Sequence, residues 1–267
     1  MKTLLRSGGK TLIGVVHLLP LPGAPRWRGQ LDAVIKLAVA DAKAYQSGGA
    51  DAVCIENFCD VPFSKGAAGP ETVAAMAAAG CAVGAAVTLP IGFNVLRNDP
   101  RAALALCAAC GGGFIRVNVH TGAMITDQGI IEGNAFDTLR HRRVVCPEAL
   151  ILADVHVKHA VPLGNSILEQ AARDTLERGL ADALIVSGAG TGLETDPSDL
   201  EAVRRAAPAA RIFLGSGVDA GNIRKCLDTA DGFIVGASLK SGGRIANPVD
   251  PKRVTALARV IHGARRR

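Results

Sequence analysis

The sequence predicts a single (βα)₈ barrel over residues 1–267. Eight short apolar runs of strand length recur along the chain, and alanine-rich stretches of helical length separate most of them. Three βα units also end with a similar sequence, at 48–53, 179–184 and 230–233. In each, the predicted helix stops at or near a glycine, and Ala-Asp leads into the next apolar run. No linker interrupts the series, and a chain of this length can bury one large core. A doubly wound open sheet is the alternative architecture.

The apolar runs define the predicted strands. In chain order they are Leu12–Val16, Ala52–Ile55, Ala82–Thr88, Phe114–Val119, Ile151–His156, Ala183–Val186, Ile212–Leu214 and Gly232–Val235. Stretches such as Leu31–Gln46 and Asn165–Arg178 have the length and the apolar spacing of helices that cover a parallel sheet. In such a barrel, ligand-binding side chains are expected at the carboxyl ends of the strands and in the loops that follow them.

The composition favours a core of small and branched aliphatic side chains. Hydrophobic residues make up 49% of the chain, but aromatic residues only 3%. The formal net charge is +6 without a long basic stretch interleaved with aromatic residues, so we expect weak attraction for anionic small molecules and no nucleic-acid partner. No stretch approaches the roughly 20 uninterrupted apolar residues of a membrane span, so none is predicted.

The seven cysteines predict a cytoplasmic protein with reduced, buried thiols. Their number is odd, and they are scattered through apolar segments. Cys107 and Cys110 form a Cys-x-x-Cys sequence, but they lie at helical spacing and no second pair accompanies them. We therefore expect neither a zinc site nor a redox site at this pair.

Polar residues gather where the predicted strands end. In chain order they are His17; Glu56 and Asn57; Thr88, with Asn94 just beyond it; Asn118 and His120; Asp154, His156 and Lys158; and Ser187. Any one of them could be a satisfied structural group. The agreement of six strand ends indicates a functional site at the mouth of the barrel.

The fifth predicted strand carries Asp154, His156 and Lys158 at alternate positions. Alternate side chains of an extended backbone leave the same face, so all three are expected to face the mouth. Burying them without partners would cost roughly several kcal/mol, which indicates a ligand or chemistry. The alternative is a buried ion pair beside a hydrogen-bonded histidine. On the first interpretation, Asp154→Asn abolishes turnover and leaves the fold intact.

The fourth predicted strand follows the same logic, with Arg116, Asn118 and His120 alternating against apolar residues. The loop after it, residues 121–147, is much longer than the roughly 2 to 6 residues usual for such connections. We expect part of it to form a helix. The whole segment is either a lid over the site or a solvated helix packed on the rim.

Two glycine-containing tripeptides predict a phosphate site. Gly215-Ser216-Gly217 follows the seventh predicted strand, and Gly236-Ala237-Ser238 follows the eighth. Glycines let backbone amides approach an anion, and the loops after these two strands often bind phosphate in such barrels. The alternative is that the glycines serve tight turns only.

Several segments together resemble the BtpA/SgcQ family over nearly the whole chain. They are Gly14–Gly23, Glu56–Phe63, Val117–Gly122, Thr126–Gly133 and Ala153–Ala160, although Cys59 stands where glycine is expected in the second. The resemblance implies a phosphate-binding type of barrel. It also implies either a link to photosystem I biogenesis or, in non-photosynthetic bacteria, action on sugars or nucleosides. It carries no residue roles.

The first functional hypothesis is therefore an enzyme that acts on a phosphorylated sugar or a nucleoside-like compound. The glycine loops would hold the phosphate, and Asn57, Asn118 and Ser187 would contact the substrate. The catalytic candidates are Asp154, His156, Lys158, Glu56, His17 and His120. Paired carboxylates suit either cleavage or transfer at an anomeric carbon, which we favour, or proton transfer in an isomerisation.

Three alternatives remain open at this point. Lys158 could form a Schiff base in an aldolase. Glu56, His120, Asp154 and His156 could hold a divalent metal, although the sequence requires no cofactor. The protein could also be a non-catalytic assembly or stability factor. We further expect a homo-oligomer, on which the sequence carries no specific signal.

Overall fold

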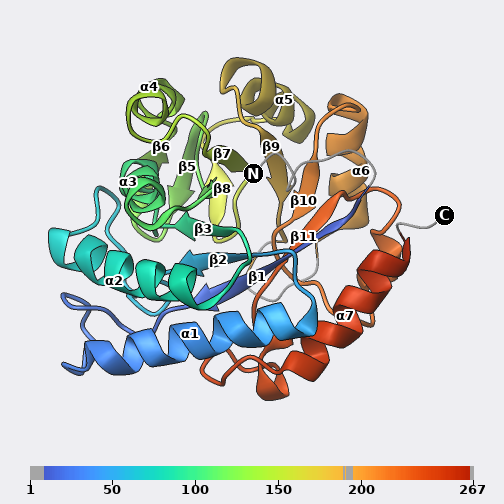
Figure 1. Cartoon of the computed structure of the whole chain (residues 1–267). Helices are drawn as coiled ribbons and strands as arrows, with labels where there is room; N and C mark the ends of the chain where they lie inside the picture. The colour runs from blue at the N-terminus through green and yellow to red at the C-terminus, as the bar shows by residue number, and fades with distance from the viewer. Residues whose placement is uncertain (1–8, 189, 191–194, 265–267) are drawn as a thin grey trace.

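Eight parallel strands form a closed barrel in which each strand pairs with its neighbours. The computed structural model describes residues 9–188, 190 and 195–264. The barrel strands are β1 (Thr11–His17), β2 (Ala52–Glu56), β3 (Ile91–Asn94), β4 (Phe114–Val117), β7 (Leu150–Val155), β9 (Ala183–Val186), β10 (Ile212–Leu214) and β11 (Gly232–Val235). Because β1 pairs with both β2 and β11, the sheet closes on itself (Figure 1). The predicted barrel is confirmed.

Helices surround the barrel on its outside (Figure 1). They are α1 (Leu31–Gly48), α2 (Pro70–Ala86), α3 (Pro100–Cys110), α4 (Ala135–Val145), α5 (Leu168–Arg173), α6 (Pro197–Ala206) and α7 (Pro251–Gly263). Three of them begin at an Asp-Pro sequence, in which Asp99, Asp196 or Asp250 accepts a hydrogen bond from a backbone N–H of the first turn. Proline at the first helical position needs no N–H partner, so this pair fixes the helix start.

Shorter helical turns complete the ring. A π-helical turn, η1 (Asp174–Arg178), continues α5 without a break. The 3₁₀ turn η2 (Ile223–Lys225) lies between β10 and β11. Two more such turns, η3 (Ala237–Leu239) and η4 (Ser241–Gly243), follow β11 directly.

Glycines inside the strands make room for the few aromatic side chains of the core. A Cβ atom at Gly14 would lie 2.3 Å from the ring of Tyr45, and one at Gly232 would lie 2.3 Å from the ring of Phe213. The Tyr45 hydroxyl, buried in the layer between barrel and helices, donates a hydrogen bond to the Val15 carbonyl at 3.0 Å. The sequence predicts a core in which small residues let backbones approach closely. In the structure, glycines of the strands let aromatic rings lie directly against the backbone.

The third strand lies later in the chain than the sequence predicts. Ala82–Thr88, predicted as a strand, is mostly the last part of α2, and β3 begins at Ile91. The run is apolar on all sides of the helix, so its periodicity does not separate a helix from a buried strand. Thr88 consequently precedes β3, where its hydroxyl donates to Gln46 at 3.1 Å, and Asn94 ends the strand instead.

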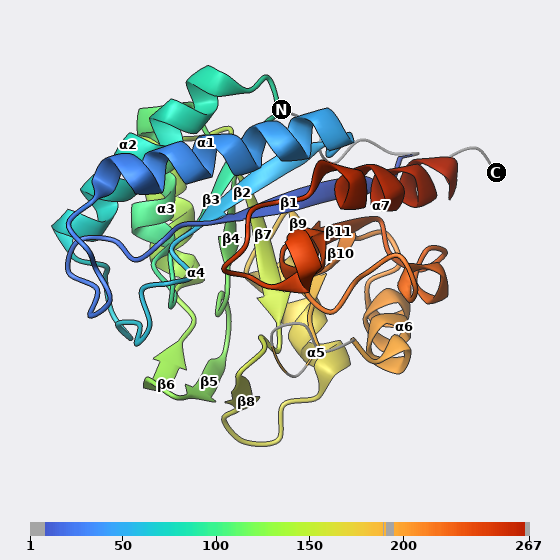
Figure 2. The same ribbon diagram turned by 90° about the horizontal axis from the view of Figure 1, so that it is seen from below.

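The long segment after β4 contains a hairpin as well as the expected helix. β5 (Ala123–Thr126) and β6 (Gly129–Glu132) form the hairpin, and β8 (Ala160–Pro162) joins it in a three-stranded antiparallel sheet. Figure 2 shows this sheet beyond the carboxyl ends of β4 and β7. Its inner side buries Met124 and Ile131. That the segment closes over the site stays a prediction.

The repeated Ala-Asp sequences have a common structural role at the amino-terminal ends of the strands, here called the amino rim. Asp51, Asp182 and Asp231 accept hydrogen bonds from the first backbone N–H groups of a neighbouring strand, at Leu12, Ile151 and Ile212, over 2.8 to 2.9 Å. Each carboxylate also contacts a basic side chain, from His262, Arg142 and Arg204 respectively, and Asp231 additionally contacts Arg211. The repeat therefore joins adjacent units of the barrel.

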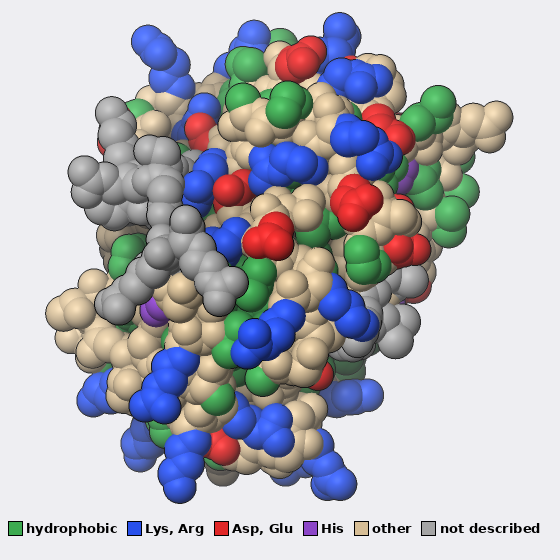
Figure 3. Space-filling view, turned by 90° about the vertical axis from the view of Figure 1, so that its right-hand side faces the viewer, with side chains coloured by type: hydrophobic (Ala, Val, Ile, Leu, Met, Phe, Trp, Pro, Cys, Tyr) green, Lys and Arg blue, Asp and Glu red, His purple; other side chains and the backbone are tan. Residues whose placement is uncertain are grey.

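Figure 3 presents the right-hand side of Figure 1. On this side, the Asp and Glu side chains of the described residues lie mainly in the upper half, mixed with Lys and Arg, whereas Lys and Arg predominate in the lower part. Among the described residues, no helix has both the length and the apolar character that a membrane span requires.

Candidate functional site

The two glycine tripeptides and several strand-end residues line one small cavity at the carboxyl ends of the strands. We call it the anion cavity, after the phosphate that the sequence predicts there, and its volume is about 90 Å³. Its lining includes Gly215, Ser216, Gly217, Gly236, Ala237 and Ser238, together with His17, Glu56, Arg116 and Lys158. A cavity of this size suits a compact group such as a phosphate. The loops after β10 and β11 thus meet at one place.

Glycine is needed in these loops for a reason that the sequence does not reveal. A Cβ atom at Gly215 would lie 2.5 Å from the Ser187 side chain, and one at Gly236 would lie 2.5 Å from the His17 ring. Glycine therefore makes room for side chains at the barrel mouth. Bulkier residues at either position would displace those side chains.

A second cavity adjoins the first and is largely apolar. This apolar cavity, of about 300 Å³, is lined by Glu56, Phe58, Val61, Phe63, Asn94, Leu96, Arg97, Asn118, Asp127, Lys158 and His159. Its volume is at the lower end of the range typical of small-molecule sites, about 300 to 1,000 Å³. Glu56 and Lys158 line both cavities, so they stand at the junction between them.

Asp154 is a fully partnered carboxylate. Arg116 donates to both of its oxygens at 2.9 Å, and Asn118 and Ser187 donate one further hydrogen bond each, at 3.2 and 3.0 Å. Burial by itself would lower the pKa of Arg116, but the charge and hydrogen bonds of Asp154 outweigh burial and raise it. The geometry corresponds to the buried ion pair that the sequence leaves as an alternative.

His156 lies beyond the end of the strand, so the extended backbone that the predicted alternation needs is absent at this residue. The strand ends at Val155, and His156 has a positive φ of 52°. The left-handed conformation turns the chain out of the strand geometry. The His156 ring contacts the Ser166 hydroxyl at 3.0 Å and lines a third cavity, which Asp154 and Asn118 also border. Burial lowers the pKa of His156.

Lys158 is brought to the junction by the loop after β7. Burial and then the positive charge of Arg116 lower the pKa of its ammonium group, against the opposing charges of Glu56 and Asp154. Within the described part of the chain, the Lys158 side chain forms no hydrogen bond or ion pair. It is therefore a cation held in the site without a fixed partner.

Glu56 and His17 stand beside each other on adjacent strands. Glu56 accepts a hydrogen bond from Asn94 at 2.7 Å. The His17 ring packs edge-on against Phe58, with 4.8 Å between ring centroids. Burial lowers the pKa of His17 to about 4, although the charge of Glu56 opposes this. The imidazole is therefore neutral at neutral pH.

His120 and Asn57 lie outside both cavities. His120 is buried and contacts the Gly179 carbonyl at 2.8 Å, beneath η1. Asn57 accepts from the Leu96 N–H at 2.8 Å and donates to Asp60 at 3.1 Å. Their geometry is that of structural groups, because neither side chain borders the space where a ligand could bind.

The set considered for a metal is divided among different environments. Glu56 lies at the junction and His120 is buried under η1. Asp154 and His156 border one further cavity, but Asp154 is paired with Arg116. In the described ranges, no three side chains of His, Cys, Asp and Glu are placed to hold a metal ion together.

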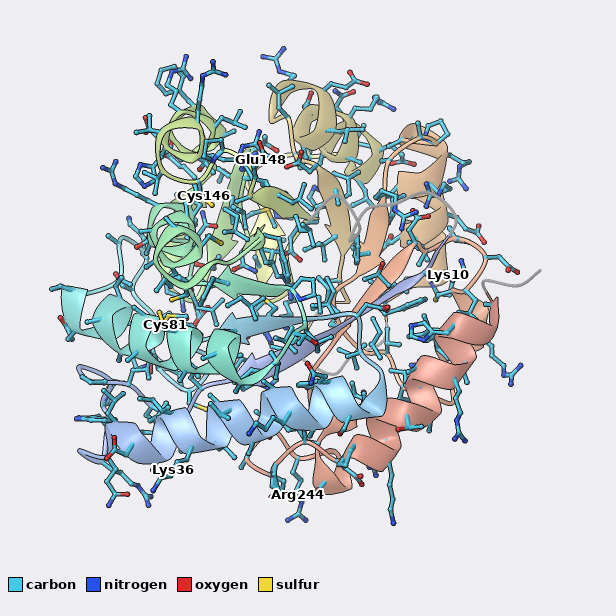
Figure 4. All side chains as sticks on the ribbon, viewed as in Figure 1. Lys10, Lys36, Cys81, Cys146, Glu148 and Arg244 are labelled. Carbon is cyan, nitrogen blue, oxygen red and sulfur yellow. The ribbon has the colours of Figure 1, made fainter. Side chains whose placement is uncertain are left out.

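The Cys-x-x-Cys pair lies on α3, as its helical spacing predicts. Cys110 does not face Cys107 but contacts Cys81 of α2, with 3.0 Å between the sulfur atoms. Figure 4 shows the sulfur of Cys81 between α2 and α3. Cys54 and Cys107 are buried, Cys81 is exposed and the other four cysteines are partly exposed, so the expectation of buried thiols is confirmed for two of the seven.

The site also contains residues that the sequence alone does not assign. Arg116 and Asn94 lie in the predicted strand-end pattern but receive no role from it. Phe58, Phe63 and Arg97 line the apolar cavity. Phe58 and Phe63 belong to the Glu56–Phe63 segment that carries the family resemblance, whereas Arg97 follows β3, which the sequence misplaces.

Comparisons with known proteins point to one family. The model of the BtpA family matches residues 8–263. The chain is 50% identical to the photosystem I biogenesis protein BtpA of Synechocystis, covering 92% of this chain and 85% of that protein. It is 36% identical to the putative sgc region protein SgcQ of Escherichia coli, covering 96% of each.

Solved structures of low sequence identity share the fold. A tryptophan synthase structure from Mycobacterium tuberculosis has a TM-score of 0.61 at 16% identity and covers 98% of this chain and 96% of that chain. Phosphoribosyl anthranilate isomerase from Thermus thermophilus has a TM-score of 0.56 at 14% identity, with 93% and 96% covered. These similarities support the barrel architecture alone.

Proposed function

The chain belongs to the BtpA family, and from its two adjoining cavities we propose that it is an enzyme acting on a phosphorylated sugar or nucleoside-like compound. The observation that carries this proposal is the position of Glu56 and Lys158. Both line the small anion cavity and the larger apolar cavity. A phosphate between the β10 and β11 loops would leave the rest of the substrate beside these two residues.

Glu56 is the proposed acid–base group of the reaction. Its carboxylate is held by Asn94 and faces both cavities, whereas Asp154 is occupied by four hydrogen bonds. Asp127 lines the apolar cavity and Asp219 the anion cavity, but among the described carboxylates Glu56 is the one that lines both. This favours an isomerisation by proton transfer over cleavage by paired carboxylates, with Lys158 stabilising negative charge that develops beside it.

A second candidate, Schiff-base chemistry, is supported by the state of Lys158. A lysine must lose its proton before its nitrogen attacks a carbonyl carbon and releases water. Burial and Arg116 lower the pKa of Lys158, which assists that step.

The name of the Synechocystis relative supports an assembly role only by analogy. The retained polar residues at the junction of the two cavities have no evident use in an inert assembly factor. We therefore place the enzymatic proposal first.

The anion cavity can be tested by a matched pair of substitutions at Ala237. Ala237→Asp adds a negative charge to the half-buried lining, and Ala237→Asn adds a neutral side chain of nearly the same shape. Calorimetric titration with inorganic phosphate, ribose 5-phosphate and glucose 6-phosphate should show binding to the wild type and to Ala237→Asn, but at least tenfold weaker binding to Ala237→Asp. Equal affinities for the two variants, or no binding of these anions to the wild type, would contradict the proposal.

The two reaction types are separated by reduction with borohydride in the presence of each sugar phosphate that binds. Isomerisation through Glu56 predicts no adduct at Lys158, and Glu56→Gln should lower turnover by about 10² to 10⁴. A mass increase mapped to Lys158, absent in Lys158→Arg, would establish the Schiff base instead.

A further inference from the structure

Three asparagines near the barrel mouth differ in how fully their amides are used. Asn57 uses both ends of its amide, because its oxygen accepts from Leu96 and its nitrogen donates to Asp60. Asn94 and Asn118 use the nitrogen alone. In each of them the amide oxygen is buried and has no hydrogen-bond partner among the described residues.

The orientation of these two amides is fixed by chemistry. Asn94 Nδ2 donates to Glu56 at 2.7 Å, and Asn118 Nδ2 donates to Asp154 at 3.2 Å. An ionised carboxylate only accepts hydrogen bonds, so the NH₂ group must face it and the oxygen must point elsewhere. A rotated amide would set oxygen against oxygen. The two unpaired oxygens are thus a consequence of the neighbouring carboxylates.

Both side chains line the apolar cavity and are almost completely buried, at 1% and 2% exposure. A buried acceptor without a donor is unfavourable, and native proteins contain few of them. Asparagine thus occurs twice in one cavity at a cost in stability. A ligand that supplies two donors would explain both.

We propose that the Asn94 and Asn118 amide oxygens accept hydrogen bonds from hydroxyl groups of the substrate, so that the apolar cavity holds the polyhydroxylated part of a sugar phosphate. Phe58, Phe63 and Leu96 provide apolar surface for its C–H groups. Two cations, Arg97 and Lys158, and two carboxylates, Glu56 and Asp127, line the same cavity, so its charges balance and suit a neutral hydroxyl donor. This inference rests on the proposed function and adds the residues that recognise the substrate.

The experiment compares sugar phosphates with analogues that lack one hydroxyl. The probes are inorganic phosphate, ribose 5-phosphate, 2-deoxyribose 5-phosphate, glucose 6-phosphate and its 2-deoxy and 3-deoxy analogues, titrated by calorimetry. We expect at least one parent sugar phosphate to bind more tightly than inorganic phosphate, and loss of one hydroxyl to weaken it about tenfold or more. In Asn94→Leu or Asn118→Leu the ratio between parent and deoxy analogue should fall to about one, with phosphate affinity unchanged.

Matched controls separate the possible outcomes. Ala237→Asp should weaken parent and deoxy analogue equally and keep their ratio. Circular dichroism identifies an asparagine variant that fails to fold. The other asparagine variant and the parent-to-deoxy affinity ratios of the wild type then test the proposal. Two results would contradict the hydroxyl subsite while leaving the anion cavity supported, provided that phosphate binds. In the first, the wild type binds every parent sugar phosphate and its deoxy analogue equally well. In the second, the preference for the parent is the same in both asparagine variants as in the wild type. If neither phosphate nor any sugar phosphate binds, the proposed function fails with it.

Discussion

The two ends of the barrel use acidic residues in opposite ways. At the amino rim, Asp51, Asp182 and Asp231 each accept a strand N–H and contact a basic side chain. At the mouth, Glu56 has one hydrogen bond from Asn94, and Lys158 beside it has no fixed partner in the described chain. In the sequence the two ends look alike, because at each of them a polar residue stands next to an apolar run.

The comparison indicates that structural acidic groups differ from functional ones in how many hydrogen bonds and ion pairs they form, and not in their position in the barrel. Asp154 makes this clear, because it ends a strand at the functional face and yet has four hydrogen bonds. It resembles the amino-rim aspartates more than it resembles Glu56. Buried polar groups that are left partly unpaired are costly, so they indicate a binding role.

The largest effect that we expect comes from neutralising Asp154. Asp154→Asn leaves the buried charge of Arg116 uncompensated and should lower the free energy of unfolding by about 3 to 5 kcal/mol. Glu56→Gln, the matched change at the same face, should lower it by about 1 kcal/mol or less. Urea denaturation of both variants measures the difference. This reverses the expectation from sequence that Asp154→Asn keeps its fold, and equal losses would remove the distinction between the two carboxylates.

A smaller effect should appear in the pH dependence of stability. Burial lowers the pKa of His17 to about 4, below its ordinary value near 6.5, so between these pH values the unfolded chain binds a proton that the folded chain does not. The stability contributed by His17 is therefore present above about pH 6.5 and is lost as the pH falls towards 4.

The slope attributable to this one group is at most about 1.4 kcal/mol per pH unit. His17→Gln should remove that part of the acid limb when urea denaturation is repeated from pH 7 to pH 4. The same acid limb in the variant and in the wild type would show that His17 does not remain neutral in the folded protein.

The sequence predicts the barrel well because the relevant signals are local and repeated. Seven of the eight apolar runs coincide with barrel strands, at least in their central residues. The exception, Ala82–Thr88, belongs mainly to a helix that is apolar on every side, and periodicity carries no information there. Strand order along the chain then places Gly215–Gly217 and Gly236–Ser238 together without further information.

The site is predicted less completely, because it depends on contacts between distant segments. Nothing in the sequence near Asp154 shows that Arg116 of β4 donates hydrogen bonds to both carboxylate oxygens of Asp154. The left-handed conformation of His156 is likewise invisible in a run that alternates perfectly as a strand. The hairpin of β5 and β6 is missed for a similar reason, since its partner β8 comes from a separate loop.

The smallest effect concerns the amino rim itself. Asp231 accepts from the Ile212 N–H at 2.9 Å and from Arg204 at 2.6 Å, lies 3.5 Å from Arg211, and its side chain is about a quarter exposed. Asp231→Asn keeps an oxygen for the strand N–H but removes the charge, so solvent-screened loss of the two ion pairs should cost about 1 kcal/mol. Asp228→Asn, an exposed position three residues earlier, removes the same charge without these contacts and should cost less. Urea denaturation measures both, and calorimetric titration with ribose 5-phosphate should give the wild-type affinity for each. A change in affinity for Asp231→Asn alone would show that the amino rim is coupled to the mouth, and would end the separation of roles between the two ends.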